Sequence, residues 1–362
     1  MIPSTKPIVR ISDVDVVFGP DPEAALALID AGKSRAEIEQ ATGQVLGVAG
    51  CTLDVYRGET IVLMGLSGSG KSTLLRAVNG LTPIARGEIL VAMDDTLTSY
   101  VNPQSCRRRT LIKLRRQRVA MVFQQFGLLP WRSVRENVGF GLEMSGVSTR
   151  QRARIIDEQL DLVGLGDWAD RRVGELSGGM QQRVGLARAF ATEAPVLLMD
   201  EPFSALDPLI RDRLQDDLLS LQERLQRTII FVSHDLDEAL KIGNRIAIMN
   251  DGRIVQQGTA RELIFAPATD YVAQFVARVN ALSVWRARDI ATLESLTKPA
   301  SAVFLGADAI GKGVPVVVPA ETPLKEVMKA LAQTGRPVLV ESNGAIIGSI
   351  SMADVVAALA AR

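Results

Sequence analysis

Residues 65–72, GLSGSGKS, combine glycines, a lysine and a hydroxyl in the spacing that cradles the phosphates of a nucleotide. The glycines let the backbone curl so that successive N–H groups point at phosphate oxygens, and the following helical run adds its positive N-terminus. Lys71 would neutralise the β- and γ-phosphates, and the Ser72 hydroxyl would ligate Mg²⁺. The predicted ATP-binding residues of this phosphate loop are Gly65, Ser67, Gly68, Ser69, Gly70, Lys71, Ser72 and Thr73.

A second GKS tripeptide, residues 32–34, lacks this context. Ala27 stands where the first glycine of the motif should be, and no apolar run precedes it. We therefore predict a turn between helical segments there, with no phosphate contact by Lys33.

Three other segments place polar side chains at the ends of apolar runs. Asp200 and Glu201 end PVLLMDE, Gln124 ends RVAMVFQ, and His234, the only histidine, ends TIIFVSH. Asp200 can hold the hydration shell of Mg²⁺, Glu201 can polarise an attacking water, and Gln124 can reach the metal or the water. For the histidine two interpretations remain at this point: a member of an ATP site, or a satisfied core residue.

The apolar runs are the elements that would position these residues. They span 60–65, 118–124, 195–201 and 228–234, and none alternates cleanly between apolar and polar residues. Strands buried on both faces are typical of a parallel sheet covered by helices, and segments of helical period lie between the runs. Ligands of such α/β sheets bind beyond the carboxyl ends of the strands, so one shared site is predicted. The alternative is that the polar residues merely terminate four strands.

The segment LSGGMQQRVGLARA, residues 176–189, indicates a second anion site. Ser177, Gly178 and Gly179 would present a hydroxyl and free N–H groups at the start of a helix. Since the phosphate loop already holds its own nucleotide, we expect these residues to serve a nucleotide bound to a second copy of the chain.

LSGGMQQR resembles the signature of ABC transporter ATPases, and the resemblance covers about residues 8–280. FQQFGLLP before it, and LLMDEP and SALDP after it, stand in the family order. The resemblance implies a P-loop ABC ATPase core with a mostly parallel sheet, an antiparallel β subdomain and a helical subdomain at about 126–190. It also implies a head-to-tail dimer with ATP between phosphate loop and signature. The resemblance implies that Glu201 is the general base, that His234 contacts the γ-phosphate and that Gln124 takes part in catalysis. It implies that Mg²⁺ is held by Ser72, Gln124 and, through water, Asp200. The signature residues that would act in trans are Ser177, Gly178, Gly179 and Gln181, and Asp207 would lie at the dimer interface.

Longer stretches, such as MGLSGSGKSTLLRAVNGL and FSALDPLIRDRLQDDL, resemble ATPase subunits of importers for glycine betaine, proline betaine and choline. An insertion at 19–48 resembles one typical of that subfamily. Phe18 stands where a tyrosine usually stacks on adenine, and core packing is its alternative interpretation. The resemblance implies two membrane permease subunits and, indirectly, a substrate-binding protein as partners. The remaining alternatives are a soluble, non-transport ABC ATPase and an importer ATPase for a different small solute.

Two segments of the core could mediate contacts. In the family, residues 126–141 transmit motion to the permease, and Leu128, Leu129 and Trp131 would suit a groove for a partner helix. Packing within the helical subdomain is the alternative. The basic run 107–118 is interpreted as a solvated helix face, because no aromatic residue is interleaved.

The length of 362 residues predicts two domains, placed at 1–280 and 281–362. Residues 315–359 read as strand, helix, strand, turn, strand, helix and resemble one CBS motif, a small α/β unit usually found in pairs. Residues 284–313 make a poor first copy, so the pair is incomplete. The resemblance implies a regulatory domain, and a dimerisation or packing module is the alternative interpretation.

Composition sets the remaining expectations. The 41 basic and 41 acidic residues balance, which speaks against a nucleic-acid partner. No window reaches the eighteen or so apolar residues of a membrane span, no secretory signal is seen, and the two cysteines fit a reducing compartment. We expect a peripheral protein on the cytoplasmic face of the cell membrane.

Overall fold

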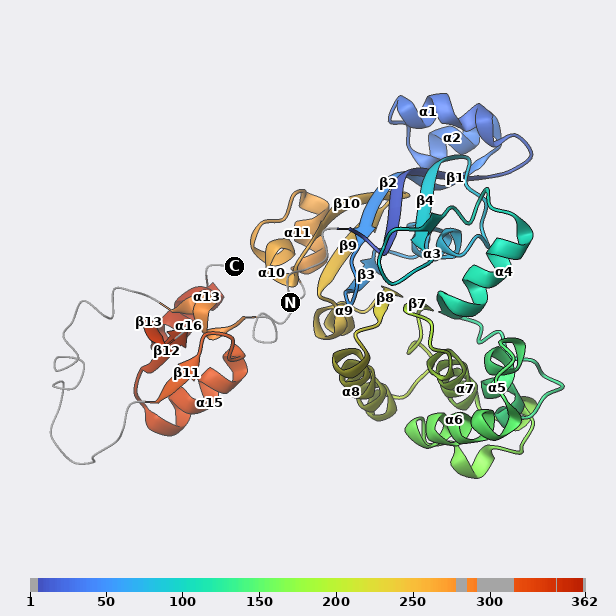
Figure 1. The fold of residues 1–362 in the computed structure, drawn as a ribbon. Coiled ribbons are helices and arrows are strands. Elements are labelled where there is room, and N and C mark those ends of the chain that lie inside the picture. Colours follow the sequence, from blue (N-terminus) through green and yellow to red (C-terminus); the bar gives the residue numbers. More distant parts are fainter. Residues whose placement is uncertain (1–5, 278–284, 292–315, 343, 361–362) are drawn as a thin grey trace, which may run out of the picture. The chain divides into compact units, whose positions relative to one another are not determined.

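The structure, a computed structural model, describes residues 6–277, 285–291, 316–342 and 344–360. The chain divides into two compact units, Met1–Ala273 and Gln274–Arg362, which are described separately (Figure 1). The strands of the first unit are β1 (Val9–Phe18), β2 (Val45–Val55), β3 (Thr60–Met64), β4 (Arg86–Ala92), β5 (Tyr100–Val101), β6 (Val119–Val122), β7 (Val196–Asp200), β8 (Thr228–Val232), β9 (Arg245–Asn250) and β10 (Arg253–Gly258). Its α-helices are α1 (Leu26–Asp30), α2 (Arg35–Thr42), α3 (Lys71–Val78), α4 (Arg108–Gln117), α5 (Val134–Met144), α6 (Thr149–Leu162), α7 (Gly178–Ala191), α8 (Pro208–Leu225), α9 (Leu236–Ile242), α10 (Ala260–Phe265) and α11 (Asp270–Val276), the last of which crosses the boundary between the units.

A mostly parallel sheet forms the centre of the first unit. Its strand order is β10-β9-β3-β8-β7-β6, and only the β9–β10 pair is antiparallel. Every residue of β3, β7 and β8 is buried, which confirms the prediction of strands covered on both faces. The strands end at Met64, Val122, Asp200 and Val232, so their carboxyl ends meet at one edge.

An antiparallel sheet of order β2-β1-β4-β5 lies beside this centre (Figure 1). Between β1 and β2 the chain forms a 3-10 turn (Pro22–Ala25), α1 and α2, so the predicted insertion ends before Val45 and not at residue 48. A capping box of Ser34 and Glu37 starts α2. A small apolar cluster holds the insertion against the sheet: Val17, Ala25, Ile29, Ile38, Leu46 and Ala49.

Helices α5, α6 and α7 pack against one another as a helical layer (Figure 1). The predicted helical period is confirmed in α6, where Ile156 and Leu160 are buried. A capping box of Ser133 and Glu136 starts α5. Its neighbour α7 is buried at most positions from Gln182 onward, so the helix that follows the signature segment packs into the core.

The second unit contains the predicted order of elements. These are α13 (Ala287–Ile290), β11 (Val317–Pro319), α15 (Leu324–Thr334), β12 (Val338–Ser342), β13 (Ala345–Ile350) and α16 (Met352–Ala360). β12 pairs in parallel with β11 and antiparallel with β13 around a core that includes Leu324, Val338 and Ile350. Pro323 occupies the N-cap position of α15. Most of the suggested first copy, and Asn343 of the turn, lie outside the described residues. Across the described ranges, no helix is long and apolar enough to cross a bilayer.

Candidate functional site

The phosphate loop joins β3 to α3 and is built for glycine at two positions. Gly65 has φ +146°, and a Cβ there would lie 2.1 Å from the Met249 carbonyl oxygen. Gly70 has φ +100°, and a Cβ there would lie 2.4 Å from the Gly47 carbonyl oxygen. No side chain fits at either position, so the loop keeps the curl that points its N–H groups into the pocket.

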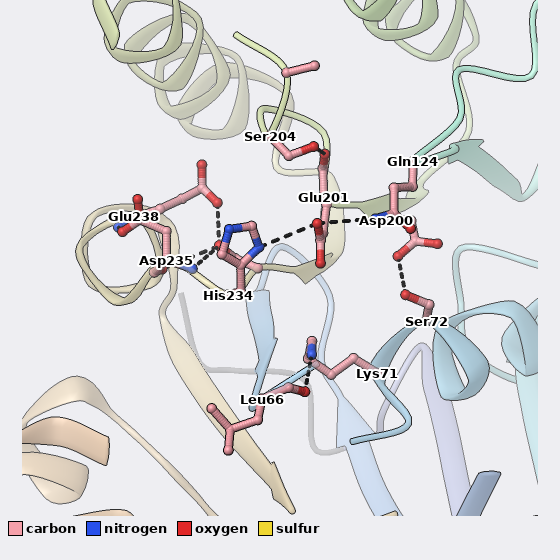
Figure 2. Close-up of polar contacts among 12 residues, drawn as sticks. Leu66, Lys71, Ser72, Gln124, Asp200, Glu201, Ser204, His234, Asp235 and Glu238 are labelled. Atoms are coloured by element: carbon pink, nitrogen blue, oxygen red, sulfur yellow. Dashed lines mark hydrogen bonds and ion pairs between the residues drawn. The ribbon is translucent and has the colours of Figure 1, made fainter. Parts of the chain in front are cut away.

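Lys71 begins α3 and its side chain folds back over the loop (Figure 2). Nζ donates to the carbonyl oxygens of Gly65 and Leu66, both at 2.9 Å. Burial lowers the pKa of Lys71, while the nearby charges of Glu201 and Asp200 act in the opposite direction. The ammonium is therefore held by neutral carbonyls, and a phosphate is a stronger partner for it.

Asp200, at the end of β7, is fully buried and has two partners. Its Oδ1 accepts from the Ser72 hydroxyl at 2.6 Å, and its Oδ2 accepts from Arg76 Nη2 at 2.9 Å. The arrangement joins the predicted metal residues of α3 and β7. Hydroxyl and carboxylate oxygens are ligands that Mg²⁺ prefers, so this pair fits the metal.

Glu201 follows in an unusual backbone conformation, with φ +48°. Its carboxylate Oε2 lies 3.3 Å from Gln124 Nε2 and 3.4 Å from His234 Nδ1, so the three side chains form a row (Figure 2). The His234 side chain is 63% exposed, which excludes the interpretation of a buried core histidine. A water molecule bound by this carboxylate would therefore lie between the Gln124 amide, which is a neutral donor, and the imidazole of His234.

Gln182 of α7 fastens the backbone around this carboxylate. The side chain is 1% exposed; Nε2 donates to the Glu201 carbonyl oxygen at 3.1 Å, and Oε1 accepts from Ala205 N–H at 3.0 Å. One buried amide therefore connects the signature helix, Glu201 and the SALDP segment.

A polar cavity of about 270 Å³ opens above the phosphate loop. Phe18 lies in its wall with 44% of the residue exposed, so the core-packing interpretation is excluded. The wall also contains Arg35, from the insertion. The predicted site residues that line the cavity are Phe18, Ser67, Gly68, Gly70, Lys71, Ser72, Thr73, Gln124 and Glu201.

The signature residues and Asp207 do not line this cavity. Ser177 caps α7 by accepting from Met180 N–H at 3.3 Å, and Asp207 caps α8 by accepting from Ile210 N–H at 3.1 Å. Ser177, Gly178 and Asp207 are exposed, while Gly179 and Gln181 are half-buried.

A second hollow, of about 440 Å³ and mostly apolar, lies between the sheet edge and the helical layer. Its walls include Ile112, Met121, Phe140 and Met144. Trp131, on the segment expected to reach a partner, is 67% exposed, whereas Leu128 and Leu129 are half-buried. The basic run forms α4 with most of its basic side chains exposed, which confirms the solvated helix face.

Three residues of the site were missed by sequence reasoning. Arg76 follows Ser72 by one helical turn, a spacing that could have pointed to it. Gln182 interrupts an otherwise apolar helix face. Arg35 carried no signal, because its contacts cross from the insertion to a loop distant in the sequence.

Comparison with known proteins gives family matches to both parts of the chain. The ABC transporter family matches residues 48–204, and the CBS domain family matches residues 312–361. The first match contains the phosphate loop, the signature and the two carboxylates.

Individual relatives align over longer stretches. The glycine betaine/proline betaine transport system ATP-binding protein ProV of Escherichia coli (strain K12) is 46% identical over 282 residues, which cover 78% of this chain and 69% of ProV. The trimethylamine N-oxide transport system ATP-binding protein TmoW of Ruegeria pomeroyi is 41% identical over 345 residues, 95% of this chain and 94% of TmoW. Among solved structures, the ATP-binding cassette MJ0796, a dimer bound to ADP and Pi, superposes with a TM-score of 0.59 at 28% identity, over 69% of this chain and 98% of that one.

Proposed function

Because the chain belongs to the ABC transporter family and is an ATPase of that family, we propose that it powers the import of a quaternary amine through membrane permease subunits. The observation that carries this proposal is the identity with ProV, a betaine transport protein, together with a complete catalytic row at the strand ends. The proposed solutes are glycine betaine, proline betaine or choline.

Trimethylamine N-oxide is a second candidate solute. The alignment with TmoW covers nearly the whole of both chains, including the second unit, whereas the alignment with ProV covers 78% of this chain. Glycine betaine and trimethylamine N-oxide each combine a methylated nitrogen cation with an oxygen anion in one small molecule, so both suit one class of transporter.

Hydrolysis would proceed as follows. ATP places its phosphates over the N–H groups of the loop, and the ammonium of Lys71 exchanges its carbonyl partners for phosphate oxygens. Ser72, Gln124 and, through water, Asp200 would hold Mg²⁺, which offsets the negative charge of the phosphates. Glu201 takes a proton from the attacking water, with Gln124 orienting that water. His234 donates to the γ-phosphate from its exposed position at the end of the row.

The signature residues support a dimer of two copies. Ser177, Gly178, Gly179 and Gln181 would complete the site of the partner copy, with Asp207 at the interface. Ser177, Gly178 and Asp207 are exposed, and none of the five residues lines the cavity of its own chain, as this arrangement requires. The related cassette MJ0796 is described as a dimer.

The apolar hollow is the proposed docking site for a permease subunit. A hollow of about 440 Å³ with Met and Phe side chains suits an amphipathic helix of a membrane subunit, and the exposed Trp131 offers a further apolar contact. The chain would then lie at the cytoplasmic face of the cell membrane, held there by its permease partners, with a substrate-binding protein as an indirect partner.

Reconstitution into lipid vesicles tests this function. The chain should copurify with a multispanning membrane protein. Vesicles that contain this complex with the ATPase chain on the inside should accumulate radiolabelled glycine betaine only when ATP is enclosed in the vesicle. Competition with unlabelled proline betaine, choline and trimethylamine N-oxide then ranks the solutes. If no membrane protein copurifies, and none of the four solutes changes ATP turnover, transport is not the function.

A further inference from the structure

The insertion between β1 and β2 brings a cation to the nucleotide cavity that no function above uses. Arg35, the first residue of α2, lines the cavity together with the phosphate loop and Phe18. Its Nη1 donates to the Gly68 carbonyl oxygen, and its Nη2 donates to the Gly47 carbonyl oxygen at 3.1 Å. The guanidinium thus joins the loop that faces the phosphates to the start of β2, next to Phe18.

The charge of this guanidinium is not neutralised by the protein. Both of its contacts go to neutral carbonyl oxygens, and in the described part of the chain no carboxylate forms an ion pair with Arg35. Its Nε is buried and has no hydrogen-bond partner among the described residues. A half-buried guanidinium without a counter-ion is costly unless an anion completes the site. The cavity that it lines is the one with the phosphate loop.

The fold holds the insertion that carries Arg35 in place by polar contacts of α1 and by the apolar cluster beneath it. The carboxylate of Asp30, at the end of α1, accepts from Arg86 at 3.0 and 2.6 Å, and Arg86 Nε donates to the fully buried Asp15 at 2.6 Å. Arg253 Nη2 donates to the Ile29 carbonyl oxygen at 3.2 Å. With Ile29 and the rest of the apolar cluster beneath it, the insertion is anchored to the β sheet, and Arg35 projects from a fixed base.

We propose that Arg35 is a nucleotide-binding residue, which pairs with the phosphate chain of ATP while it holds the phosphate loop at Gly68 beside Gly47 of β2. This inference rests on the proposed nucleotide site and adds a contact to it from the insertion. A guanidinium has five N–H donors, and two carbonyl contacts leave others for phosphate oxygens. The role is in binding, not in the chemical step.

Nucleotide binding to Arg35→Ala, Arg35→Gln and the control Lys33→Ala tests the proposal. Lys33 lies two residues away, pairs with Glu37 at 2.8 Å and does not line the cavity. Its replacement by alanine removes the same single positive charge as Arg35→Ala, so it controls for the change in net charge. ATP and ADP affinities are measured by calorimetry on the full chain, together with KM and kcat for ATP. Arg35→Ala should weaken ATP binding about 10-fold, as expected for a charge-assisted hydrogen bond, with KM rising and kcat nearly unchanged.

Arg35→Gln separates the effect of the guanidinium charge from that of its hydrogen bonds to the carbonyl oxygens. It also keeps the proposal testable if the alanine variant does not fold. Glutamine retains an amide donor for one carbonyl but carries no charge, so it should also weaken ATP binding about 10-fold, while Lys33→Ala stays within about 2-fold of the unmodified chain. ATP affinities of both Arg35 variants equal to that of Lys33→Ala would overturn the proposal, as would a fall in kcat at constant KM. Failure of the unmodified chain to bind ATP would instead overturn the nucleotide site itself.

Discussion

Gln182 provides a quantitative test of how the catalytic backbone is held. Its side chain is 1% exposed and bridges the Glu201 carbonyl oxygen and the Ala205 N–H. Replacement by alanine removes both hydrogen bonds. The Glu201 carbonyl oxygen keeps the Ser204 N–H at 3.3 Å and the Ser204 hydroxyl at 3.1 Å, whereas the Ala205 N–H loses the amide oxygen that accepts from it. A hydrogen bond contributes about 1 kcal/mol net and a buried group left unpaired costs about 1–3 kcal/mol, and water entering the space vacated by the side chain favours the low end. We expect Gln182→Ala to lower the free energy of unfolding by about 2 kcal/mol.

Urea denaturation measures this loss. With a slope of about 3 kcal/mol per molar urea for a unit of this size, the midpoint of unfolding should fall by about 0.7 M. Hydrolysis should fall at least about 10-fold as well, because Gln182 is one of the contacts that hold Glu201 at φ +48°, and its loss lets that backbone relax. Gln222→Ala is the matched control: Gln222 donates to the Gly58 carbonyl oxygen at 2.7 Å and has no contact with Glu201, so kcat should be unchanged. A midpoint within about 0.2 M of the unmodified chain, with normal kcat, would refute this reasoning.

Three further predictions concern single side chains. His234→Ala should reduce hydrolysis about 100-fold but change unfolding by less than about 0.5 kcal/mol, since the side chain is 63% exposed; a large loss of stability in urea would contradict this. Phe18→Ala should weaken ATP and ADP binding alike by about 10-fold in calorimetry, because adenine is common to both, whereas Phe18→Tyr should bind normally; unequal losses would argue against stacking. Burial raises the pKa of the Cys51 thiol to about 12, so its thiolate is scarce at pH 8; mass spectrometry should find N-ethylmaleimide on half-buried Cys106 and reach Cys51 only after denaturation.

The strand-end residues could be predicted from sequence because their positions follow from one rule of sheet geometry. Continuous apolar runs indicate parallel strands, and parallel strands end at the same edge, so Asp200, Glu201, Gln124 and His234 had to come near the phosphate loop. The same reasoning left the environment of His234 undecided. Its exposure depends on the packing of the loop after β8, which no local pattern encodes.

Contacts between distant elements could not be predicted in this way. Gln182 looks like a polar interruption of α7 until the Glu201 backbone is placed beside it, and Arg35 looks like an ordinary surface residue of a short helix. The left-handed backbone of Glu201 likewise has no sequence signature, since glutamate is not favoured there and only the surrounding contacts hold it. Such features depend on tertiary structure.

Glu201 is the proposed base in ATP hydrolysis. This role is tested by ATP binding and single-turnover phosphate release in the unmodified chain and in Glu201→Gln, which keeps the shape and a contact partner for Gln124 and His234 but cannot take a proton. We expect ATP binding within about 3-fold of the unmodified chain and phosphate release slower by about 1,000-fold. Near-normal phosphate release by Glu201→Gln would exclude Glu201 as the base.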